Sequence, residues 1–96
     1  MSLRVFKYAF NVEDRFSVEM PEDATILHVD VQGEQGPCMW ALVDEVKPVV
    51  SRRFAVFGTG HRIPLEGALL YVRTFQQPPR TFQQPPFVWH LFEVNP

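Results

Sequence analysis

The segment with the most distinctive potential for chemistry consists of Gly58, Thr59, Gly60, His61 and Arg62. The two glycines permit positive φ angles and a close approach of the backbone to a ligand. Consecutive backbone N–H groups in such a turn can bind an anion, and His61 with Arg62 could add a positive charge or an acid–base group. The segment lacks the lysine and the following helix of a phosphate-binding loop. It indicates either a small-ligand or anion site, to which His90 could contribute, or a tight turn capped by a His61 hydrogen bond.

The three histidines, His28, His61 and His90, are the candidate metal ligands. Zinc and redox metals are bound by imidazole, thiolate and carboxylate groups, often from residues close together in the sequence. Here 33 and 29 residues separate successive histidines, so the sequence has no local ligand pair. A histidine- or metal-dependent enzyme would need the fold to bring them together. We therefore expect no metal and no other cofactor, and we assign no catalytic residue.

Cys38 is the only cysteine, so the chain cannot form an internal disulfide. This fits a reducing compartment. Its neighbours Met39 and Trp40 are apolar, which predicts a buried core thiol. A nucleophilic cysteine would need a base and an orienting group beside it.

The charge is unevenly distributed along the chain, although the net charge is only −2. Residues 1–45 contain nine acidic and three basic residues, whereas residues 46–96 contain two acidic and six basic residues. Strands from both halves that interleave in one sheet would cancel this difference, and we expect that outcome. The overall balance argues against a nucleic-acid-binding protein, although a platform for a single strand is conceivable. Its members would be Arg52, Arg53, Arg62, Arg73, Arg80, Phe54, Phe57, Tyr71 and Phe75.

Apolar and polar residues alternate in short runs that end at turn residues, a pattern typical of strands with one buried face. The strands are predicted at residues 3–8, 15–20, 25–32, 38–44, 52–58, 69–75 and 87–94. In the third of these, Leu27, Val29 and Val31 should share the buried face. Residues 65–69 could form one helical turn, but no segment predicts a long helix. We predict a single domain, residues 1–96, folded as a small all-β antiparallel sandwich or partly open barrel of six to seven strands with little helix.

The heptapeptide RTFQQPP occurs twice in succession, at residues 73–79 and 80–86. A repeat solenoid needs at least three stacked units, so two copies do not indicate one. We interpret residues 73–86 as a duplicated loop insertion, since the entropy cost of closing a loop rises slowly with its length. The paired prolines favour polyproline II structure, a form that a partner protein could recognise.

Four further segments are distinctive: RVFKY at residues 4–8, CMWALVD at 38–44, VFGTGHRIP at 56–64 and VWHLFEV at 88–94. Together they resemble a family of short, uncharacterised proteins encoded by bacteriophages and prophages. The Gly-Thr-Gly-His and Trp-His-x-Phe-Glu parts are the most specific. The resemblance implies a phage origin and a location in the cytoplasm of the bacterial host cell or on the virion. It supplies no activity.

No apolar run approaches the ~18 residues of a membrane-spanning helix, and no signal peptide is recognisable, so we expect no membrane partner. Without a catalytic constellation, the sequence favours a structural or interaction protein over an enzyme. Exposed strand edges would let it self-associate or pair with a phage or host protein, and a symmetric dimer is the default homo-oligomer. The alternatives are a ligand- or anion-binding module at residues 58–62 and a histidine- or metal-dependent enzyme.

Overall fold

The computed structural model describes residues 1–64, 67–79 and 84–96. Within these ranges lie seven β-strands and one short 3₁₀ turn, η1 (Gly33–Gln35). The strands are β1 (Leu3–Ala9), β2 (Arg15–Pro21), β3 (Thr25–Val31), β4 (Pro37–Asp44), β5 (Val49–Gly58), β6 (Leu69–Gln77) and β7 (Phe87–Val94). The predicted all-β fold is confirmed, and each strand lies close to its expected position.

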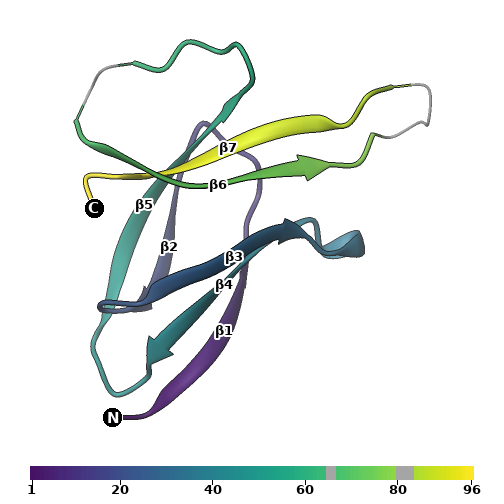
Figure 1. Ribbon diagram of the computed structural model, residues 1–96. Helices are drawn as coiled ribbons and strands as arrows, with labels where there is room; N and C mark the ends of the chain where they lie inside the picture. The colour runs from purple at the N-terminus through teal and green to yellow at the C-terminus, as the bar shows by residue number, and fades with distance from the viewer. Residues whose placement is uncertain (65–66, 80–83) are drawn as a thin grey trace.

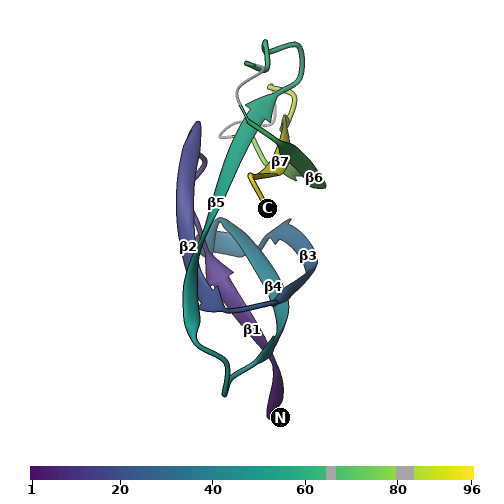
Figure 2. The same ribbon diagram turned by 90° about the vertical axis from the view of Figure 1, so that its left-hand side faces the viewer.

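The strands form two antiparallel sheets, with the orders β1-β4-β3 and β2-β5-β7-β6. The sheets pack in a sandwich-like arrangement, and the larger one twists so strongly that β6 and β7 run across the direction of β2 (Figure 1; Figure 2). At one side of the molecule β6 approaches β3, where Arg73 Nη2 donates a hydrogen bond to the Leu27 carbonyl oxygen at 2.9 Å. This contact partly closes the sandwich along these two edges.

One apolar core lies between the sheets because alternate side chains of both sheets point inward. Phe54 of β5 and Leu91 of β7 are completely buried, as are Met39 and Ala41 of β4. β4 is the central strand of its sheet, as its apolar sequence predicts. Its second face points away from the core, so Leu42 is exposed.

Strand β3 departs from strict alternation. Its register with β4 shifts between Ile26 and His28, which makes Leu27 the extra residue of a β-bulge. Ile26 packs against the core and Val29 is buried, whereas Leu27 is 43% exposed. The prediction that Leu27 shares the buried face with Val29 and Val31 is therefore wrong, because the bulge shifts the alternation by one residue.

The two halves of the chain fold largely into different sheets. All strands of the three-stranded sheet come from residues 1–45, and only β2 of the four-stranded sheet does. The expected interleaving is therefore found only in part, where β2 pairs with β5. Between the strands, Lys47 of the second half forms an ion pair with Asp23 of the first at 2.8 Å.

The duplicated heptapeptide is only partly a loop. Residues 73–77 of the first copy belong to β6, so the insertion predicted at 73–86 begins too early. Residues 80–83 of the second copy lie outside the described residues, as do residues 65–66 of the predicted helical turn.

Candidate functional site

The turn after β5 has the geometry that its glycines permit. The His61 N–H donates a hydrogen bond to the Gly58 carbonyl at 3.1 Å, and Gly60 has a φ of 84°, as the third residue of a type II turn requires. The Gly58 N–H in turn donates to His61 Nδ1 at 3.3 Å. The tight turn capped by His61 is therefore present.

Gly58 also makes room for the His61 ring. A Cβ atom at position 58 would lie 2.8 Å from His61 Cε1, which is too close for a real contact. Gly58 is opposite Trp89 in the β5–β7 register, so the missing side chain leaves space beside that indole. The glycine thereby determines where the His61 ring lies.

His90 connects this turn to strand β6. Its Nε2 lies 2.9 Å from Thr59 Oγ1, and its Nδ1 lies 2.9 Å from Thr74 Oγ1. The Tyr71 hydroxyl is 2.8 Å from the same Thr74 oxygen. A neutral imidazole donates from one ring nitrogen and accepts at the other, so this network can orient the ring in a single tautomer. The arrangement holds His90 in place and contains no activated nucleophile.

A hollow of about 430 Å³, here called the distal hollow, lies between the turn and the start of β7. It is lined by Gly58, Thr59, His61, Pro86, Phe87, Val88 and Trp89. The rings of Phe87 and Trp89 are stacked, with centroids 5.9 Å apart. Trp89 Nε1 donates a hydrogen bond to Gln77 Oε1 at 3.2 Å. An aromatic wall with a few polar groups suits a small apolar or aromatic molecule.

The structure brings five of the six predicted ligand-binding residues together. Thr59 and His90 are in contact, and Gly58, Gly60 and His61 complete the turn beside them. Arg62 is exposed and forms no ion pair within the described part of the chain. The N–H groups of Gly58 and His61 already donate hydrogen bonds within the turn, so they are not free to bind an anion.

Four residues of this region were missed by sequence reasoning: Tyr71, Thr74, Phe87 and Trp89. They meet the turn only because β7 pairs with both β5 and β6. No local sequence signal specifies that pairing.

The whole chain, residues 1–96, matches the model of a family described as a domain of unknown function, DUF7352. The chain belongs to the DUF7352 family. No curated protein and no solved structure matches the chain. No helix in the described ranges of this DUF7352 protein is long and apolar enough to span a membrane.

The remaining histidine of the DUF7352 chain lies on the other sheet. His28 packs against Trp40, with ring centroids 5.7 Å apart, and its Nε2 is 3.6 Å from Asp30 Oδ2. Among the described residues, no three His, Cys, Asp or Glu side chains cluster closely enough to hold a metal ion. Cys38 is completely buried, with its Sγ 3.6 Å from the Gly36 carbonyl.

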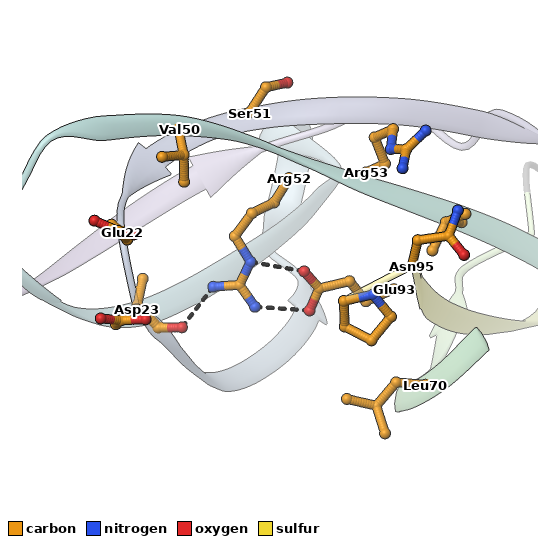
Figure 3. A pocket seen from close by; sticks show the side chains of 12 residues that line it. Glu22, Asp23, Val50, Ser51, Arg52, Arg53, Leu70, Glu93 and Asn95 are labelled. Atoms are coloured by element: carbon orange, nitrogen blue, oxygen red, sulfur yellow. Dashed lines mark hydrogen bonds and ion pairs between the residues drawn. The ribbon is translucent and has the colours of Figure 1, made fainter. Parts of the chain in front are cut away.

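A second hollow, of about 470 Å³, contains an ion pair between β5 and β7 (Figure 3). Arg52 donates from Nε to Glu93 Oε2 at 2.8 Å and from Nη2 to Oε1 at 2.7 Å. Arg52 Nη1 reaches the Ala24 carbonyl, and the two side chains are only 18% and 8% exposed. The hydrogen bonds to Glu93 raise the pKa of Arg52 above its ordinary value. Both groups are saturated by each other and by the backbone, so this pair is a structural link.

The nine arginine and aromatic residues considered as a platform for single-stranded nucleic acid do not lie together on one surface. Arg52 points inward to Glu93, and Phe54 and Phe75 belong to the core. Arg80 lies outside the described residues. Of the original set, Arg53 and Phe57 remain on the outer side of the four-stranded sheet, together with Tyr71.

Proposed function

We propose that this DUF7352 protein is a non-catalytic interaction module that self-associates through the edge strand β1. The observation that carries this proposal is the regularity of that edge. All seven residues of β1 pair in register with β4, and no described strand pairs with its other side. A regular, unprotected edge presents unpaired backbone groups to a second chain.

Each of the other three edge strands contains an irregularity or a proline. β3 is interrupted by the bulge at Leu27, and β6 has a register shift between Tyr71 and Arg73. β2 pairs in register with β5 along all seven residues, but its last residue, Pro21, has no backbone N–H to donate. β1 contains neither a bulge nor a proline. A β1–β1 contact is therefore the pairing that these edges favour.

An apolar patch lies beside this edge. Val5 of β1 is directly opposite Leu42 of β4 on the face that points away from the core. Leu3 and Val5 are 56% and 55% exposed, and the half-buried Trp40 extends the patch. Antiparallel pairing of β1 with its copy would place the two patches side by side about a two-fold axis.

The test is light scattering coupled to size-exclusion chromatography over a wide range of protein concentration. The mass should rise from 11.1 kDa towards twice that value. Val5→Glu should hold the protein as a monomer. Val46→Glu, at an exposed loop position outside the patch, should leave the association unchanged. A strict monomer at every concentration, or equal behaviour of the two variants, would refute the proposal.

We also propose a phage or prophage origin, with action in the bacterial cytoplasm or on the virion. The support is the resemblance of four sequence segments to phage-encoded proteins. The test is the gene neighbourhood: genes for phage proteins on both sides would support it. A consistent position among host metabolic genes would contradict it.

A second candidate function is binding of a small aromatic or apolar molecule in the distal hollow. The contact between Thr59 and His90 and the stacked Phe87–Trp89 wall favour it. In a thermal-shift screen, a true ligand at ~100-fold excess over its Kd should stabilise the protein by ~2.7 kcal/mol. Gly58→Ala, which displaces the His61 ring, should abolish the shift, whereas His28→Ala on the other sheet should retain it. Equal shifts in both variants would place the ligand elsewhere.

A further inference from the structure

The outer face of the four-stranded sheet is a second distinct surface, and no other layer of the described chain covers it. The strand registers define one row of side chains across it. Arg15 of β2 is opposite Ala55 of β5. Ala55 is opposite Phe92 of β7, and Phe92 is opposite Tyr71 of β6. The row therefore runs from a basic residue, over a small one, to two aromatic rings.

The aromatic part of this face is continuous. The Phe92 ring meets Phe57 on one side and Tyr71 on the other, with centroid distances of 5.7 Å in both pairs. We call Phe57, Phe92 and Tyr71 the aromatic strip. Tyr71 is 54% exposed and the two phenylalanines are half-buried. Aromatic side chains on an open sheet are surfaces on which unpaired bases stack.

Two arginines flank the strip on the same face. Arg15 and Arg53 occupy diagonal positions on β2 and β5, since Ser17 is opposite Arg53. A shallow hollow of about 230 Å³ is lined by both arginines, together with Ser17 and Val94. Within the described residues, neither arginine forms an ion pair with a carboxylate. Their positive charge is thus available to a ligand.

The charge of this sheet supports an anionic ligand. The strand registers place two basic residues on its outer face, Arg15 of β2 and Arg53 of β5. Among the described strands, Glu19 of β2 is the acidic residue that the registers place on this face. It is opposite Ser51, and Arg53 lies between it and the aromatic strip. A local positive potential attracts phosphate groups regardless of the overall charge.

We propose that the outer face of the four-stranded sheet binds single-stranded nucleic acid, with bases on the aromatic strip and phosphates at Arg15 and Arg53. Arg15 is two strand spacings, ~10 Å, from Phe92, a gap that its long side chain can reduce. Ala55 between them is completely buried, so a ligand would contact the side chains around it. Tyr71 also belongs to the hydrogen-bond network of His90, but no residue of the aromatic strip lines the distal hollow or lies on the β1 edge.

The test is fluorescence anisotropy with labelled oligothymidylate and oligouridylate at low salt. Binding should weaken as salt rises, because phosphate contacts release counterions. Phe92→Ala or Tyr71→Ala should lower the affinity at least ~5-fold. Arg15→Ala and Arg53→Ala should each reduce the slope of log affinity against log salt by about one. Arg4→Ala removes an exposed arginine from the other sheet and should change neither quantity.

Several results would overturn the proposal. One is the absence of binding by the wild-type protein at low salt. A second is equal weakening by Arg4→Ala, which would mean non-specific attraction. Thymidine monophosphate binding as tightly as the oligomer would point to a free nucleotide, and polyglutamate binding as tightly would point to an acidic protein segment. Circular dichroism of each variant establishes that it is folded, and Tyr71→Ala replaces Phe92→Ala if the latter unfolds.

Discussion

At the scale of single residues, the Arg52–Glu93 pair shows how a buried charge is tolerated. Removing a charge from water is costly, and the cost is recovered only if the partner and its hydrogen bonds are well placed. Here two hydrogen bonds of 2.7 and 2.8 Å join the groups, and the Ala24 carbonyl accepts another N–H of Arg52. The pair thereby fastens the β2–β3 turn to strands β5 and β7.

Breaking this pair from one side should be strongly destabilising. Arg52→Ala leaves the Glu93 carboxylate buried without its partner, and we expect a loss of ~3–5 kcal/mol in the free energy of unfolding. The double variant Arg52→Met/Glu93→Leu replaces both charges by apolar groups and should recover most of that loss. Urea denaturation measures both. A single variant as stable as the wild type would show that the pair contributes little.

Asp44 should contribute to the acid sensitivity of the fold. Its carboxylate accepts the Ser2 N–H at 3.0 Å, and this bond lowers the pKa of Asp44, as do the Val46 N–H and the positive charges of the N-terminus and Lys47. A lowered folded-state pKa means that the stabilisation is complete above the unfolded pKa and is lost as pH falls through the folded one. In urea denaturation between about pH 5 and pH 2, Asp44→Asn should therefore lose less stability than the wild type. Parallel curves would contradict this prediction.

At the scale of elements, periodicity located every strand but not its irregularities. Alternation cannot show that Leu27 is an extra residue, because the bulge is defined by the partner strand β4. The turn at Gly58 was predictable from its glycines, and so was its His61 cap. The contact between Thr59 and His90 was not, since it depends on the pairing of β5 with β7.

Deletion of one heptapeptide should destabilise the end of the β6–β7 hairpin. Removing either copy gives the same sequence, and the first copy already makes the contacts: Phe75 is in the core and Gln77 binds Trp89. Gln77 pairs with Phe87, so the deletion would leave only two prolines as the hairpin loop, and proline cannot adopt the positive φ angles that a two-residue hairpin loop requires. Phe75→Ala is the comparison and should cost ~3–5 kcal/mol. A deletion variant as stable as the wild type in urea denaturation would contradict the prediction.

At the scale of the whole molecule, both sheets share one core. Phe54 and Leu91 of one sheet belong to the same buried cluster as Met39 and Val43 of the other. The sequence predicted a sandwich or barrel but could not assign strands to sheets. That partition depends on pairings between residues far apart in the chain, such as β2 with β5.

The shared core predicts that both sheets unfold together. Trp40 reports on the three-stranded sheet and Trp89 on the four-stranded sheet. The variants Trp89→Phe and Trp40→Phe each keep one tryptophan. In each variant, the urea transition followed by tryptophan fluorescence should coincide with the transition followed by far-UV circular dichroism. Separate transitions within either variant would show that one sheet melts before the other.

The order of strands also has a consequence for synthesis. β1, β3 and β4 can form their sheet once residue 44 has left the ribosome, but β2 bonds only to β5, which starts at Val49. Until β5 has emerged, the backbone of β2 has no strand to pair with, and its apolar side chains Phe16, Val18 and Met20 are incompletely covered. A nascent chain arrested between these points is therefore the species most prone to aggregate during translation.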